Sequence, residues 1–252
     1  MKGTKIYYKK TRMRNPVLIV GLPGIGNVGS LVCEHIRDSI HARRFATLNS
    51  PHFLHQTVML KNGGMRLINN RFYYKDNKGK NTIVILLGDT QAGTPEGQYE
   101  VNEKIVKFFK SLGGKKIYTI GGYSAGNQFV HNPRVFGVAT SKNMRKELAA
   151  RGVVFGKAAG TIWGSAGLIP AFARKNGLEG ACLMGETAML EIDANAAKAV
   201  LDVLKKLLGI DISLDNIDKI KKETERLIKE VEDAAKAQEY GPQNKENLTY
   251  IR

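Results

Sequence analysis

The sequence predicts an α/β fold with a mainly parallel, partly mixed sheet, and three observations lead to this prediction. Short continuous apolar runs at 17–20 and 82–87 are typical of buried central strands. Segments with helical periodicity alternate with such runs, as expected when helices cover both faces of a sheet. Of the 252 residues, 42% are hydrophobic, which is enough for a substantial buried core.

The elements follow from local patterns. Strands are predicted at 17–20, 45–48, 82–87, 116–120, 135–140 and 181–184, and helices at 30–39, 97–112, 143–150, 169–176 and 194–208. Pro95 and Gly113-Gly114 bracket the second helix as start and stop signals. Residues 53–60 and 65–74 alternate around Asn62-Gly63-Gly64, which predicts a hairpin and makes the sheet locally mixed.

The C-terminal part has a different pattern. Residues 214–237 carry an apolar seam in heptad spacing, formed mainly by Ile217, Ile220, Leu227 and Val231. This predicts an α/β core domain at 1–210, an amphipathic assembly helix at 211–239 and a flexible tail at 240–252. The seam is consistent with two arrangements, packing on its own domain or pairing with a second copy.

The charge balance is strongly basic, with a formal net charge of +16 from 39 Lys and Arg against 23 Asp and Glu. Such an excess can attract RNA, but no basic run alternates with aromatic residues here. We therefore favour a solvated surface, of the kind found in heat-adapted proteins, over a nucleic-acid groove. No apolar run approaches the roughly 18 residues that span a bilayer, and no signal peptide is recognised, so we expect a cytoplasmic protein.

Metal and disulfide chemistry is not indicated. Cys33 and Cys182 lie far apart, and a reduced intracellular pair is favoured over a disulfide. His52 and His55 have a ligand-like spacing, but the strand expected there would point them to opposite faces. No Cys-x-x-Cys accompanies them, so no structural zinc is expected.

A glycine loop follows the first apolar strand. Gly24, Gly26 and Gly29 match the G-x-G-x-x-G pattern of dinucleotide sites, between a predicted strand and a predicted helix. No acidic residue for a ribose ends the next strand, so the loop can equally be a tight turn that packs helix on strand. The alternative function is therefore a nucleotide- or nucleoside-binding enzyme that uses these glycines with Asp89.

Other catalytic patterns are incomplete. Ser124 lies in a G-x-S-x-G motif after a strand, but the last histidine, His131, comes too early for a hydrolase triad. Asp89, Glu96 and Glu186 follow strands or open a helix, so each can serve a site or only a cap. No base, nucleophile and orienting group occur together, and no catalytic residue is predicted.

Four motifs together resemble one family. They occupy 20–29, 121–123, 164–168 and 183–187, and their order and spacing over 16–208 resemble the proteasome assembly chaperones, above all the archaeal homologues. The resemblance implies a three-layer, nucleoside-phosphorylase-like core without catalytic activity or an obligatory cofactor. It also implies a homo-oligomer that binds proteasome α subunits.

The C-terminus departs from the family pattern. Members of the family that dock on the proteasome end in a hydrophobic residue, a tyrosine and any residue, whereas this chain ends in Tyr250, Ile251 and Arg252. Tyrosine stands one position too early, so proteasome α subunits or a different protein are both retained as partners. The tail and the seam are the predicted protein-binding elements.

Overall fold

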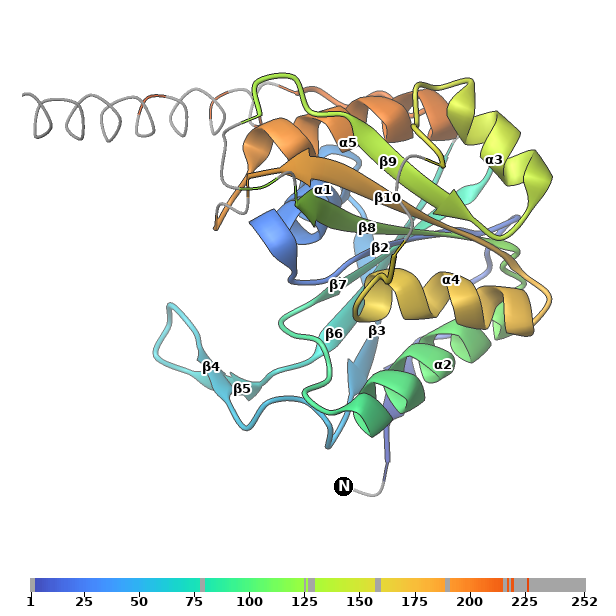
Figure 1. Ribbon diagram of the computed structural model, residues 1–252. Coiled ribbons are helices and arrows are strands. Elements are labelled where there is room, and N and C mark those ends of the chain that lie inside the picture. The colour runs from blue at the N-terminus through green and yellow to red at the C-terminus, as the bar shows by residue number, and fades with distance from the viewer. Residues whose placement is uncertain are drawn as a thin grey trace, which may run out of the picture.

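The computed structural model describes residues 3–77, 80–124, 126, 130–156, 160–188, 191–214, 217, 219 and 226. The main sheet contains β1 (Lys5–Tyr8), β2 (Val17–Gly21), β3 (Arg43–Asn49), β6 (Asn70–Asp76), β7 (Thr82–Gly88), β8 (Lys116–Ser124), β9 (Val135–Ala139) and β10 (Glu179–Thr187). The helices are α1 (Val28–Ser39), α2 (Pro95–Ser111), α3 (Lys142–Ala149), α4 (Ser165–Lys175) and α5 (Ala194–Leu208). Helices cover both faces of this sheet, which confirms the predicted α/β fold class (Figure 1).

The strand order is β1-β3-β6-β7-β2-β8-β10-β9. The four strands β7, β2, β8 and β10 run parallel, and the flanking strands pair antiparallel. Every residue of β2 is buried, as its continuous apolar sequence predicts. After β2, the chain forms β3, β6 and β7 on one side of that strand. It then forms β8, β9 and β10 on the other side. The strand order therefore reverses between β2 and β8, where open α/β sheets usually bind their ligands.

Two hydrophobic cores lie on the two faces of the sheet. Helices α1, α3 and α5 contribute to one core, and α2 and α4 contribute to the other. Three of the helices begin at a side-chain cap of the type expected from sequence, because Thr94, Ser141 and Asp193 each accept a hydrogen bond from a backbone N–H of the first turn. Gly209 ends α5 in the left-handed conformation that favours glycine.

Several boundaries differ from the prediction. The segment Lys5–Tyr8 forms an edge strand that was not predicted, because it depends on pairing with β3, which is distant in sequence. The region of His52 and His55 is a turn rather than a strand, and His52 Nε2 lies 3.0 Å from a Glu100 oxygen. The predicted strand 65–74 is split, because its first part pairs within a separate hairpin and its second part joins the main sheet.

That separate hairpin consists of β4 (Thr57–Met59) and β5 (Met65–Leu67), and it projects from the body of the molecule (Figure 1). The predicted turn at Asn62-Gly63-Gly64 joins the two strands, and Gly63 has the positive φ of 81° that the turn requires. Helix α4 begins at Ser165, earlier than predicted, and β8 continues to Ser124.

The described part of the C-terminal segment packs on its own domain. Ile210, Ile212 and Ile217 are buried in the core of the α1–α5 face, so the core continues past the expected boundary at residue 210. His35 Nε2 lies 2.6 Å from the Ser213 carbonyl oxygen and holds the segment against α1. Of the predicted seam, Ile217 thus contacts its own subunit. The other predicted binding residues, Ile220, Leu227, Val231, Tyr250, Ile251 and Arg252, lie outside the described residues.

Both cysteines are free, as predicted, and the structure shows that both are also buried. Burial raises the pKa of the Cys182 thiol to about 11, although a hydrogen bond with Thr119 opposes the shift, and burial also raises the pKa of Cys33 strongly. Within the described ranges no three His, Cys, Asp or Glu side chains are grouped as metal ligands. No described helix combines the length and apolar character needed to cross a membrane.

Candidate functional site

The glycine loop forms a tight turn between β2 and α1. A short 3-10 turn at Ile25–Asn27 leads into the helix, and Gly26 adopts a φ of 62°. A Cβ atom on Gly29 would lie 2.7 Å from the Ile120 carbonyl oxygen, which is too close for any residue with a side chain. A Cβ on Gly21 would lie only 2.0 Å from the Gly29 carbonyl oxygen. These glycines therefore allow α1 to approach β2 and β8 closely, as the tight-turn interpretation requires.

Gly24 differs from the other loop glycines. The nearest atom that a Cβ on Gly24 would meet is 3.9 Å away, and its φ of −171° is ordinary extended backbone. Gly24 and Gly29 both line a cavity, whereas Gly26 faces Thr187 and Asp193 instead. The structure thus brings only two of the three predicted loop glycines to one concave surface.

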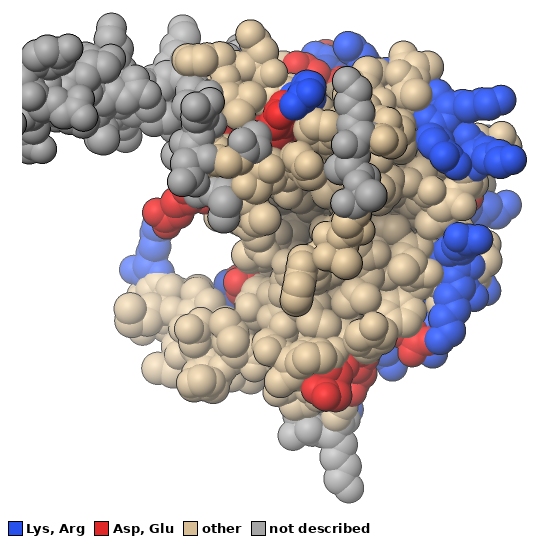
Figure 2. Space-filling view, viewed as in Figure 1, with Lys and Arg blue, Asp and Glu red and all other residues tan. Residues whose placement is uncertain are grey.

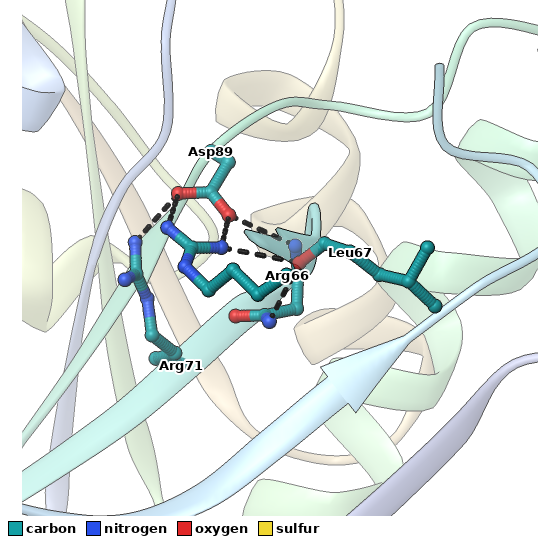
Figure 3. A network of polar contacts seen from close by, with 5 residues as sticks. Arg66, Leu67, Arg71 and Asp89 are labelled. Carbon is teal, nitrogen blue, oxygen red and sulfur yellow. Dashed lines mark hydrogen bonds and ion pairs between the residues drawn. The ribbon is translucent and has the colours of Figure 1, made fainter. Parts of the chain in front are cut away.

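Asp89 does not join these glycines. It follows β7, and its carboxylate accepts hydrogen bonds from Arg66 at 2.5 and 3.0 Å, from Arg71 at 2.7 Å and from the Asn69 backbone N–H at 2.9 Å (Figure 3). Burial raises the pKa of Asp89, but these hydrogen bonds and the two positive charges outweigh it, so the pKa lies below its usual value. Asp89 therefore fixes the root of the β4–β5 hairpin. Neither it nor Glu96 caps α2, since Thr94 does so.

A cavity of about 700 Å³ lies at the carboxyl ends of β2 and β8, where the strand order reverses. It opens as a hollow in the uncharged centre of the face shown in Figure 2. All described residues that line it are uncharged, and they include Ile25, Tyr123, Phe136, Trp163 and Met184. Trp163, the only tryptophan of the chain, is 88% exposed at this site.

The two glutamine side chains that line the cavity are both engaged in hydrogen bonds. Gln91 Nε2 donates to the Pro23 carbonyl at 2.7 Å, and Gln91 Oε1 accepts from the Ser165 N–H at 2.9 Å. Gln98 Nε2 donates to the Ala92 carbonyl at 2.7 Å. This network joins the glycine loop to the starts of α2 and α4. Because it uses these amides internally, mostly apolar surface remains for an occupant of the cavity.

Catalytic chemistry has little support at this site. Ser124 ends β8 and lines the cavity, and its hydroxyl accepts a hydrogen bond from the Gly126 N–H at 3.3 Å. None of the described lining residues is a histidine, carboxylate or lysine that could act as its base. Glu186, the other predicted candidate, accepts hydrogen bonds from the Arg134 side chain and backbone, and the first of these lowers its pKa most.

The hairpin presents a surface that the sequence analysis did not single out. Met59 pairs with Met65 and Thr57 pairs with Leu67, so these four side chains share one face of the ribbon. Met59 is 88% exposed, Met65 76% and Leu67 61%. Arg66 lies on the opposite face and binds Asp89. The sequence pattern that could have predicted this surface is the alternation of apolar residues on both sides of the Asn-Gly-Gly turn.

The described residues thus form an uncharged cavity at the switch point of a three-layer α/β fold, and an exposed apolar hairpin projects from the same domain. The chain belongs to the PAC2 family, whose model matches residues 18–232. This confirms the resemblance seen in the glycine motifs.

Known proteins resemble the chain over nearly its whole length. An uncharacterised protein of Methanocaldococcus jannaschii, MJ1210, is 37% identical over 243 residues, which cover 95% of this chain and 93% of that protein. The crystal structure of Pyrococcus furiosus PbaB, an archaeal proteasome activator, is similar with a TM-score of 0.86 and 35% identity, covering 92% of this chain and all of PbaB. Pyrococcus furiosus PbaA, an archaeal homologue of proteasome-assembly chaperone, matches with a TM-score of 0.75 and 27% identity over 94% of this chain and 97% of its own.

Proposed function

We propose that this chain is a non-enzymatic, homo-oligomeric binding protein that acts on the proteasome or its α subunits in the manner of an assembly chaperone. The observation that carries the proposal is the similarity to PbaB, which extends over all of that chain at 35% identity. The site agrees with it, because the cavity is apolar and its described lining offers no acid–base pair. A cytoplasmic location belongs to the same proposal.

The proposal assigns a role to each of the three predicted segments of the chain. The α/β domain at 1–210 would provide the body of each subunit, the helix at 211–239 would extend from it, and the tail at 240–252 would contact the partner. Because Tyr250 stands one position too early for the docking pattern of the family, a different protein partner is the main alternative within this proposal.

Native mass spectrometry of the full chain, alone and with purified proteasome α subunits, tests the proposal. We expect a defined homo-oligomer that captures α subunits, and a loss of capture when residues 241–252 are removed. Replacing only Tyr250 by alanine then tests whether the displaced tyrosine contributes to the capture of α subunits. A homo-oligomer that binds no α subunits, with or without the tail, would indicate a different protein partner. A monomer that binds no α subunits would overturn the proposal.

The second candidate function is nucleotide or nucleoside binding at the cavity. It is favoured by one observation, namely that Gly24 and Gly29 line the cavity at the switch point, beside the start of α1. A ligand present at 100 times its dissociation constant should stabilise the folded protein by about 2.7 kcal/mol. A thermal-shift panel of nucleotides and nucleosides that moves the melting temperature for none of them would dismiss this function.

A further inference from the structure

We propose that the apolar hairpin face formed by Thr57, Met59, Met65 and Leu67 docks into the cavity of a second copy of this chain, beneath its Trp163. The inference rests on the homo-oligomer of the proposed function and names the surfaces that form it. It does not involve the C-terminal helix or tail.

The hairpin face is built to meet another molecule. Met59, Met65 and Leu67 are mostly exposed, so this face makes few contacts within its own chain. Large apolar side chains that gather at one exposed place usually mark an interaction site, and methionine is enriched at the centres of protein interfaces. Methionine is also flexible, which lets it fill an irregular cavity.

The hairpin is also held in place before docking. On its opposite face, Arg66 forms a two-pronged ion pair with Asp89 at 2.5 and 3.0 Å. The Asn69 backbone N–H binds the same carboxylate, and the Asp89 N–H donates to the Asn69 carbonyl at 3.2 Å. Figure 3 shows the bonds from Arg66, Arg71 and the Asn69 N–H converging on the Asp89 carboxylate at the hairpin root. Such anchoring reduces the entropy that would otherwise be lost on binding.

The cavity provides a matching surface. Its described lining is uncharged and mainly apolar, and its volume of about 700 Å³ leaves room for several side chains. Ile25 and Val138 line it and are 45% and 42% exposed, and Trp163 is more exposed still. An exposed tryptophan beside an apolar cavity is the type of residue that dominates binding energy at interfaces.

The apolar protrusion and the uncharged cavity occur on one chain, which argues for a second copy as the occupant. Two molecules that each carry +16 repel one another, so they can associate only where charged groups are few. Figure 2 shows the hairpin and the hollow on the same largely uncharged face, while Lys and Arg gather toward α3 and the C-terminal ends of α2 and α4. A protrusion and a cavity of the same chemistry on one chain permit a reciprocal contact or a ring.

The test compares three full-length variants by sedimentation. Met59→Glu/Met65→Glu places charge on the hairpin, Val138→Glu places charge at the cavity, and Tyr7→Glu is the matched control at an exposed aromatic residue on β1. We expect both the hairpin and the cavity variants to weaken self-association by about 100-fold or more, as charged groups in the centre of an apolar interface do. The control should assemble as the wild type does.

Two further readouts separate docking from misfolding. Mixing the hairpin variant with the cavity variant pairs one intact hairpin with one intact cavity, so a heteromeric species should form although neither variant assembles alone. Trp163 emission, which reports only this site because the chain has one tryptophan, should be blue-shifted in the wild-type assembly relative to the hairpin variant.

Hairpin variants that assemble like the wild type with unchanged Trp163 emission would overturn the inference and leave the homo-oligomer standing. Variants that assemble normally but no longer bind proteasome α subunits would assign the hairpin to that partner, which also overturns it. A wild-type chain that stays monomeric would refute the homo-oligomer and the hairpin contact together.

Discussion

Replacement of Asp89 by asparagine tests whether one carboxylate holds the hairpin on the body. Asparagine keeps the shape of the side chain but removes its charge, and its amide nitrogen cannot accept a hydrogen bond. Asp89 accepts four hydrogen bonds in the native protein, three of them from the positively charged Arg66 and Arg71. The variant therefore leaves at least one guanidinium nitrogen facing another donor.

The expected loss of stability follows from the burial of the three side chains. Asp89 is 14% exposed, Arg66 27% and Arg71 23%, so the cluster is shielded but not dry. Hydrogen bonds to charged groups contribute about 1.5–3 kcal/mol each, yet they are not additive within one network. We therefore expect a total loss of about 2 kcal/mol, which lowers the melting temperature of a chain of this size by about 4–8 °C.

The assay is guanidinium unfolding at fixed protein concentration, combined with hydrogen exchange of the hairpin amides. The Leu60 N–H, bonded to the Gly64 carbonyl at 2.8 Å, should exchange faster in the variant. A double-mutant cycle with Arg66→Met isolates the coupling of Asp89 with Arg66. Unfolding within about 0.5 kcal/mol of the wild type, together with unchanged exchange in the hairpin, would refute the clamp, because surface substitutions commonly change stability by no more than this.

The same cluster predicts a pH dependence. The native pKa of Asp89 is lowered, so its contribution is fully present above the ordinary aspartate pKa of about 3.9 and is lost as the pH falls through the lowered native value. The stability difference between wild type and Asp89→Asn should therefore be constant near neutral pH and shrink below about pH 4. A difference that widens with acidification would contradict the assigned direction.

Two further predictions concern the core. Gly29→Ala should cost about 1–3 kcal/mol because its Cβ meets a backbone oxygen of β8, whereas Gly24→Ala should stay within about 0.5 kcal/mol, and denaturant midpoints for the pair check this. Equal effects at the two glycines would contradict the packing role of the loop. Cys33 and Cys182 should resist a thiol reagent at pH 8 in the folded protein and react in denaturant, and rapid labelling of either thiol in the native state would contradict their burial.

Much of the fold could be predicted from local sequence patterns. Helix α5 begins and ends where the apolar periodicity predicts, because the Asp193 cap and Gly209 define its ends locally. The strands β2 and β7 were predicted from continuous apolar runs, since a strand buried on both faces needs no alternation. The glycine motifs were sufficient to indicate the family, which the PAC2 match confirms.

The site was less predictable, because its parts are brought together only by the fold. Asp89 was a candidate ligand by its place after a strand, and nothing in the sequence indicated that Arg66 and Arg71 would bind its carboxylate. The cavity combines the glycine loop, the end of β8 and the start of α4, which are distant in sequence. No periodicity predicts which apolar residues stay exposed, so Trp163 was not singled out.

The sequence by itself therefore determined the fold class, the order of most elements and the family, because caps, turns and apolar runs are local signals. Only the tertiary structure decided that Ile217 packs on its own domain, that the strand predicted at 65–74 divides, and that the glycine loop faces an uncharged cavity. The physical reason is that burial and pairing depend on long-range neighbours. A residue's own neighbours in sequence fix its backbone preference but not the surface it meets.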